Sequence, residues 1–144
     1  IGDLKGLPHE CQNSLYEAIE KTKSNTNITL VLALNYSSKW EIKEMVKTLS
    51  SKISNNEITE NDITDELVSA HLTTEKIPDP ELLIRTSGER RVSNFLLWQI
   101  AYTEFVFLDL FWPDFGRKEF IAAVYDFQNR ERRFGMVSEQ IKTE

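Results

Sequence analysis

A short, uninterrupted run of apolar residues, Asn27–Leu34, constrains the fold of this chain more than any other feature. Its β-branched and leucine residues are typical of a strand that is buried on both faces. Two further short runs, at 81–84 and 105–108, are predicted to be strands as well. A strand, a long helical crossover and a second strand form a βαβ unit, whose strands are parallel. The sequence therefore predicts an α/β fold with a parallel sheet flanked by helices.

Helical spacing of apolar residues predicts helices around these strands. The expected ranges are 9–23, 38–53, 61–72, 93–102 and 116–133. Three strands alone leave exposed sheet edges, which natural domains avoid, and the chain opens at Ile1 without a methionine. We therefore expect residues 1–144 to be the C-terminal part of a single domain whose N-terminal part is missing from this chain.

Composition narrows the class of protein. The chain has 17 basic and 23 acidic residues, a net charge of −6, and 40% hydrophobic residues, an ordinary balance for a soluble protein. No apolar run approaches the roughly 20 residues of a membrane helix. The lone cysteine, Cys11, cannot form an internal disulfide. We expect a cytoplasmic protein, and the acidity argues against nucleic acid as a partner.

Arginines and aromatic residues are concentrated in the second half of the chain. Every arginine lies after residue 84, and most aromatic residues lie between Phe95 and Phe134. Arginine is favoured where a planar group must hold a carboxylate or a phosphate. The distribution fits either a phosphate site or structural ion pairs in a more buried half.

The segment 83–95 is the candidate site. It leaves the carboxyl end of a predicted strand at Arg85, turns, and enters a predicted helix at Ser93. Ligands of open α/β sheets bind at such strand ends, and a helix N-terminus favours an anion. Arg85, Arg91 and the Ser93 hydroxyl together predict a phosphate or diphosphate ligand. The alternative is that Ser93 only caps the helix, and that the arginines pair with Glu89 and Glu104.

Glu104 precedes the third predicted strand. A carboxylate beside a diphosphate repels the ligand unless Mg²⁺ bridges the two. Its alternative role is a structural ion pair with one of the arginines, and the sequence leaves both open.

Five ordered motifs resemble those of the bacterial undecaprenyl diphosphate synthases, a family of cis-prenyltransferases. The resemblance implies the cis-prenyltransferase fold, and the weaker stretch 32–40 extends it over nearly the whole chain. The motifs are Ile84–Glu89 (IRTSGE), Arg91–Gln99 (RVSNFLLWQ), Tyr102–Glu104 (YTE), Trp112–Asp114 (WPD) and Arg133–Gly135 (RFG).

The resemblance implies a homodimeric enzyme that condenses isopentenyl diphosphate repeatedly onto an allylic diphosphate, farnesyl diphosphate, with cis geometry. Its product would be undecaprenyl diphosphate, the lipid carrier for cell-wall synthesis, and membrane association would be peripheral at most. The implied residue roles are diphosphate binding by Arg85, Arg91 and Ser93, Mg²⁺ binding by Glu104, and contribution of Arg133 and Gly135 across the dimer to the partner's site.

The family's catalytic aspartate matches no residue here and is expected upstream of Ile1. This chain would then carry the isopentenyl diphosphate half-site and be inactive alone. The alternative within the family is a non-catalytic partner subunit of a heteromeric cis-prenyltransferase. Such subunits tend to lose the diphosphate-binding residues, so the presence of Arg85, Arg91 and Ser93 favours the enzyme.

Overall fold

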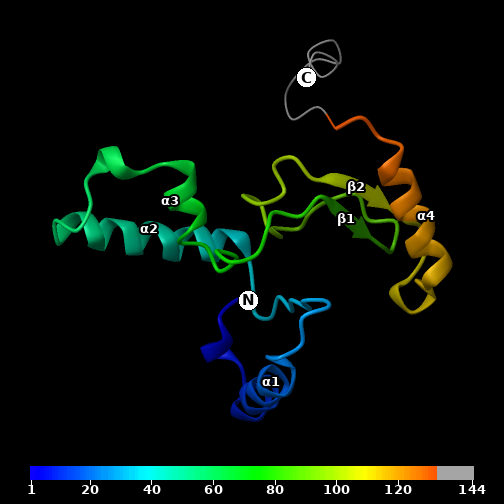
Figure 1. Ribbon diagram of the computed structural model, residues 1–144, viewed down its shortest axis with the longest axis horizontal. Coiled ribbons are helices and arrows are strands. Elements are labelled where there is room, and N and C mark those ends of the chain that lie inside the picture. Colours follow the sequence, from blue (N-terminus) through cyan, green and yellow to red (C-terminus); the bar gives the residue numbers. More distant parts are fainter. Residues whose placement is uncertain (133–144) are drawn as a thin grey trace. The chain divides into compact units, whose positions relative to one another are not determined.

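The computed structural model describes residues 1–132, which divide into two compact units (Figure 1). The first unit consists of residues 1–78 with 94–96, and the second of residues 79–93 with the chain from residue 97. Buried apolar side chains form a small core in each unit: Met45, Leu49 and Leu72 in the first, and Ile100, Val106 and Ala123 in the second. None of the helices within residues 1–132 combines the length and the apolar character needed to cross a membrane.

The helices of the first unit follow the predicted pattern closely. α1 spans His9–Thr22 and α2 spans Ser38–Ser54, which confirms the first two predicted helices. Ser37 caps α2, because its side chain accepts a hydrogen bond from the Trp40 amide.

The third helix of this unit starts later than predicted. A 3-10 turn occupies Glu60–Asp62, and α3 spans Asp65–Ser69 rather than beginning at residue 61. The reason is a second cap, since the Thr64 side chain accepts a hydrogen bond from the Leu67 amide.

The strand predicted at 27–34 is wrong for this structure, in which the segment has no strand assignment. Its apolar side chains are exposed, with Ile28 at 86% and Leu30 at 81%. The Ile1 amine donates to the Leu32 carbonyl at 2.7 Å, and the Leu34 amide donates to the Ile1 carbonyl at 2.9 Å. These two bonds form a single step of a parallel ladder, which is too short for a strand. A buried strand needs neighbours on both sides, and residues 1–132 supply only this contact.

Gly2 lies where these two segments approach each other. Its φ is +110°, and a Cβ built there would lie 2.1 Å from the Leu34 carbonyl oxygen. Both features favour glycine, because a side chain would combine backbone strain with a clash against backbone atoms.

We expect Gly2→Ala to lower the free energy of unfolding by about 2 kcal/mol, the range for a residue forced into a strained backbone conformation. Urea unfolding of the full chain measures this loss. Gly6→Ala is the matched control, because its added Cβ would meet only the movable side chains of Asn35 and Asp3. Equal losses for the two variants would show that the approach to Leu34 is not what requires glycine.

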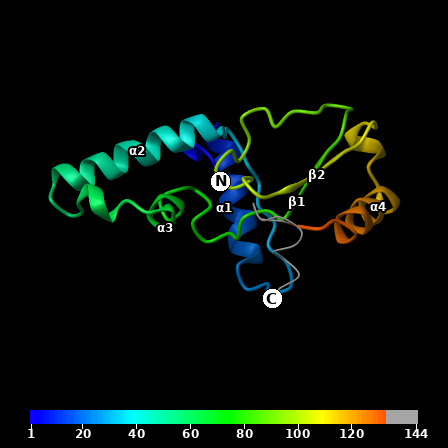
Figure 2. The same ribbon diagram turned by 90° about the horizontal axis from the view of Figure 1, so that it is seen from above.

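The second unit holds the parallel pair of strands. β1 spans Leu82–Arg85 and β2 spans Glu104–Phe107, lying side by side in both views (Figures 1 and 2). They are parallel, and their register runs from Leu82 opposite Glu104 to Arg85 opposite Phe107. This confirms the last two predicted strands and their direction. After a 3-10 turn at Trp112–Asp114, α4 spans Arg117–Gln128 and packs against β2.

The helix predicted at 93–102 is also wrong, because the segment forms turns. Ser93, Asn94 and Leu96 all have positive φ values, of 48°, 61° and 49°. A right-handed helix cannot continue through such left-handed residues. The last predicted helix, 116–133, exists but ends at Gln128. The candidate site therefore has no helix N-terminus after Arg91.

Candidate functional site

The Arg85 side chain organises the candidate site at the carboxyl end of β1. Its Nη1 donates a hydrogen bond to Ser93 Oγ at 3.1 Å and another to the Arg91 backbone carbonyl. The loop that leaves β1 therefore folds back onto the last residue of the strand. Two of the three predicted ligand-binding side chains, Arg85 and Ser93, are in direct contact.

The first part of this loop is tied to the segment that follows β2. The Ser87 amide donates to the Leu110 carbonyl at 2.6 Å, and the Gly88 amide donates to the Leu108 carbonyl at 2.9 Å. These bonds hold the loop at the shared carboxyl edge of the two parallel strands, where ligands bind in open α/β sheets. The location predicted from sequence is thus reproduced, although backbone turns replace the expected helix.

Arg91 lies in the same loop but points its charge elsewhere. Its guanidinium forms an ion pair with Glu89, and its side chain is 66% exposed. Exposed ion pairs contribute about 0–1 kcal/mol, so an anionic ligand can displace Glu89 at little cost. The pairing of an arginine with Glu89 is nevertheless the structural alternative raised from sequence, and it holds for Arg91.

The charge of the loop favours an anion. Residues 85–93 contain Arg85, Arg90 and Arg91 against the single carboxylate of Glu89. Arg90 and Arg91 are exposed and Arg85 is half-buried. Guanidinium groups form paired, charge-assisted hydrogen bonds with phosphate oxygens. The loop can therefore bind a phosphate or a diphosphate.

Glu104 is not part of this cluster. It begins β2 opposite Leu82, three positions before Phe107, the partner of Arg85. At the usual rise per strand residue, these two levels of the ladder are about 10 Å apart. Glu104 Oε2 accepts a hydrogen bond from Arg130 Nη1 at 3.0 Å. The ion pair that the sequence offered as an alternative role is thus present in this structure.

Arg130 makes two further contacts in the second unit. It donates to the Phe105 carbonyl at 2.8 Å and to Asp126 Oδ2 at 2.5 Å. The hydrogen bonds with Glu104 and Asp126 raise the pKa of the Arg130 guanidinium. Sequence reasoning missed this residue and interpreted Arg130 only as part of a basic helix end. The signal was the surplus of arginine over acid around residue 130.

The donor set for Mg²⁺ is limited in this part of the chain. Within residues 1–132, no group of three or more histidine, cysteine or acidic side chains is arranged to hold a metal ion. Glu104 is a partly exposed single carboxylate with Oε2 engaged by Arg130. Mg²⁺ usually takes one or two carboxylates and completes its shell with water and substrate phosphates. Glu104 therefore fits as one such ligand, and not as a metal site by itself.

The remaining predicted site residues, Arg133 and Gly135, lie outside the described residues.

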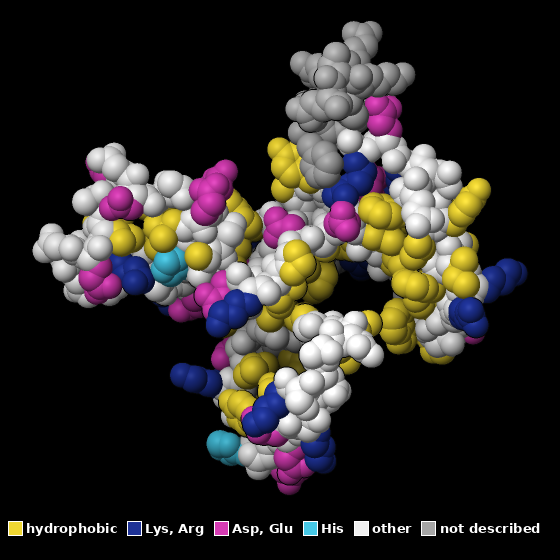
Figure 3. Space-filling model, viewed as in Figure 1, with side chains coloured by type: hydrophobic (Ala, Val, Ile, Leu, Met, Phe, Trp, Pro, Cys, Tyr) yellow, Lys and Arg dark blue, Asp and Glu magenta, His cyan; other side chains and the backbone are white. Residues whose placement is uncertain are grey.

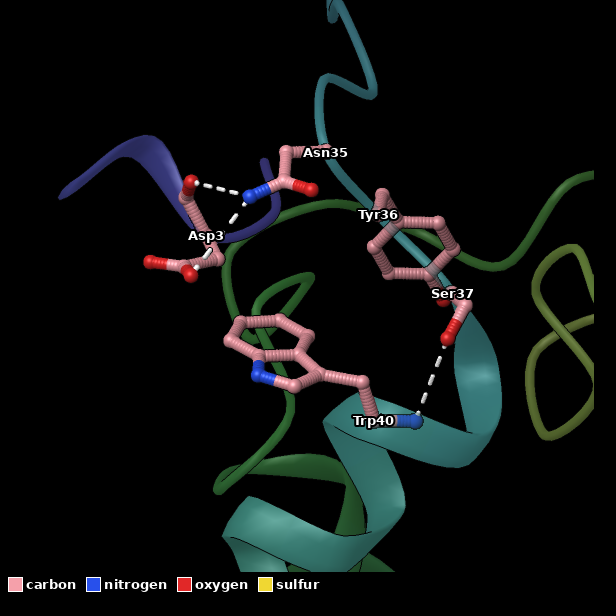
Figure 4. A pocket seen from close by; sticks show the side chains of 5 residues that line it. All are labelled: Asp3, Asn35, Tyr36, Ser37 and Trp40. Atoms are coloured by element: carbon pink, nitrogen blue, oxygen red, sulfur yellow. Dashed lines mark hydrogen bonds between the residues drawn. The ribbon is translucent and has the colours of Figure 1, made fainter. Parts of the chain in front are cut away.

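A separate pocket lies in the first unit, at the start of α2 (Figure 4). Its volume is about 250 Å³, and the Trp40 and Tyr36 rings flank it. The Tyr36 hydroxyl donates to Glu41 Oε2 at 2.6 Å. Burial, together with this bond to Glu41, raises the pKa of Tyr36 to about 12. Sequence reasoning did not find this pocket, whose other lining residues are Asp3, Asn35 and Ser37.

The fold and the loop after β1 define an α/β protein that binds phosphorylated ligands at the carboxyl edge of a parallel sheet, the architecture of the cis-prenyltransferases. A family model described as "Putative undecaprenyl diphosphate synthase" matches residues 1–135. The chain belongs to this family, as the motifs predicted.

Curated relatives agree with the family. The chain is 50% identical over 141 residues to an isoprenyl transferase of Porphyromonas gingivalis, covering 98% of this chain and 56% of the relative. It is 45% identical over 142 residues to the ditrans,polycis-undecaprenyl-diphosphate synthase ((2E,6E)-farnesyl-diphosphate specific) of Vibrio vulnificus, covering 99% of this chain and 57% of the relative. The chain thus spans little more than half the length of these relatives.

Solved structures confirm the fold. Lavandulyl diphosphate synthase from Lavandula x intermedia, in complex with dimethylallyl diphosphate, superposes with a TM-score of 0.91 at 35% identity, covering 94% of this chain and 58% of the other. A probable undecaprenyl diphosphate synthase from Campylobacter jejuni gives a TM-score of 0.79 at 30% identity, covering 94% and 61%.

Proposed function

We propose that this chain provides the isopentenyl diphosphate half-site of a cis-prenyltransferase that makes undecaprenyl diphosphate. The enzyme would condense isopentenyl diphosphate repeatedly onto an allylic diphosphate, here farnesyl diphosphate. The contact of the Arg85 guanidinium with Ser93 Oγ at the carboxyl end of β1 carries this proposal. The function named for the Vibrio vulnificus relative supports it.

In this proposal the described residues bind and orient the substrate. Arg85 and Arg91 neutralise the diphosphate, and the Ser93 hydroxyl donates to one of its oxygens. Fixing the head group places the isopentenyl double bond in register with the allylic carbon that loses its own diphosphate. Such orientation replaces a bimolecular encounter by a reaction within one complex, which supplies much of the rate. No residue of 1–132 is assigned a catalytic role.

Mg²⁺ is part of the proposal, with Glu104 as the described residue that would hold it. When bound, the ion would neutralise negative charge on the diphosphate and so assist its binding and departure.

We also propose a homodimer, to which Arg133 and Gly135 would contribute across the interface. Exposed aromatic residues of the second unit support a partner surface, since Phe111 and Trp112 are each 70% exposed. Figure 3 shows hydrophobic side chains gathered around the α4 region. Contiguous apolar surface of this kind is typical of protein interfaces.

The test is an assay of the full chain with labelled isopentenyl diphosphate and farnesyl diphosphate. We expect long polyprenyl diphosphates that form only in the presence of Mg²⁺. Omitting farnesyl diphosphate is the control, because isopentenyl diphosphate alone has no allylic carbon to react. A folded full chain that forms no product with both substrates and Mg²⁺ would contradict the proposed function.

A further inference from the structure

Arg130 is held more completely than a surface ion pair requires. Its guanidinium contacts three oxygens from separate positions: Glu104 Oε2, the Phe105 carbonyl and Asp126 Oδ2. Its side chain is 29% exposed, much like the 28% of Glu104. Because the fork of donors is planar and rigid, three acceptors fix both its position and its plane.

The consequence falls on the Glu104 carboxylate. Arg130 Nη1 also bonds the carbonyl of Phe105, the residue next to Glu104, so the guanidinium is anchored to the β2 backbone. Glu104 Oε2 is therefore tied to its own strand, and the carboxylate loses most of its rotational freedom. Oε1 forms no ion pair with a described residue and remains for another partner.

The local charge leaves this carboxylate attractive to a cation. Arg130 is shared between Glu104 and Asp126, so the three side chains carry a net charge of −1. The guanidinium orients Glu104 without cancelling the negative charge of the cluster.

We propose that Arg130 is a positioning residue, which holds Glu104 by Oε2 so that Oε1 meets the metal ion of a Mg²⁺–diphosphate ligand. This inference rests on the proposed function. Lysine in the same place keeps the charge but cannot hold three acceptors with one planar fork. Arg130→Lys therefore separates orientation from charge.

Calorimetric titration of the full chain with isopentenyl diphosphate alone, with Mg²⁺ or with a chelator, tests the proposal without turnover. We expect Arg130→Lys to weaken binding five- to tenfold with Mg²⁺ and to change it less than twofold without the ion. Arg117→Lys is the matched control, because Arg117 lies in the first turn of the same helix. It is expected to bind as the wild type does under both conditions.

Glu104→Gln decides whether Arg130 acts through Glu104. If it does, the double variant with Arg130→Lys binds no more weakly than Glu104→Gln alone. Additive losses, or an equal loss with and without Mg²⁺, would show that Arg130 only stabilises the fold, and thermal unfolding would locate that loss. A wild type that transfers prenyl groups while Arg130→Lys binds normally would overturn this inference alone. A wild type that neither binds nor transfers would overturn the proposed function as well.

Discussion

Arg85→Ala should weaken binding of isopentenyl diphosphate to the full chain by about a hundredfold, or about 2.7 kcal/mol. The substitution removes a charge-assisted contact with the ligand. It also removes the hydrogen bonds to Ser93 Oγ and to the Arg91 carbonyl that shape the loop. Two losses from one side chain make this the largest binding effect that we expect. Calorimetry measures it directly.

Arg90→Ala is the matched control for this prediction. Arg90 is an exposed arginine in the same loop, and the resemblance to the family assigns it no ligand. We expect its affinity to stay within threefold of the wild type. Arg91→Ala should fall between the two, at tenfold or more, because Arg91 can bind the ligand without shaping the loop. Equal effects of all three variants would mean that only the overall positive charge attracts the diphosphate.

Glu41→Ala should cause the largest loss of stability, about 3–5 kcal/mol, the range for breaking a buried charged network from one side. Glu41 is only 3% exposed. It accepts hydrogen bonds from the Tyr36 hydroxyl at 2.6 Å and from the amide and hydroxyl of Thr73 at 2.8 and 2.5 Å. Removing the carboxylate leaves these donors without their acceptor in a site closed to water. Urea unfolding of the full chain provides the measurement.

Glu44→Ala is the control, because Glu44 lies one turn further along α2 and forms an exposed pair with Lys47. Its loss should stay below about 0.5 kcal/mol. If Glu44→Ala destabilises the protein as much as Glu41→Ala, helix propensity rather than the buried network explains both.

The same network gives stability a pH dependence. The folded pKa of Tyr36 is raised from 10.0 to about 12, so the folded protein keeps the phenol proton longer than the unfolded chain does. The contribution of this group is therefore complete below pH 10 and is lost as the pH rises toward 12. The Glu41→Ala variant should lose less stability across this window than the wild type.

Elements that depend on local signals were predictable from the sequence. The helices at α1 and α2 have continuous apolar periodicity, and the short apolar runs at β1 and β2 pair as parallel strands. The strand predicted at 27–34 failed because a ladder depends on neighbours that the segment itself does not specify.

The site shows the same division. Arg85 and Ser93 could be placed together because the loop that joins them is short and starts at a strand end. The left-handed backbone at Ser93 and Leu96 could not, since apolar spacing in 93–102 is compatible with a helix. The pair of Glu104 with Arg130 joins residues 26 positions apart. Sequence offered several arginines as partners and no rule for choosing among them.

The hydrogen bond between Arg85 and Ser93 has one more consequence. A donor that braces its own loop must release part of that grip when a guest arrives, so the free energy of association is a net exchange and not a sum of new contacts. Occupancy and loop rigidity are then coupled through a single guanidinium. Amide-proton exchange across residues 86–93 should accordingly report on whether the site is filled.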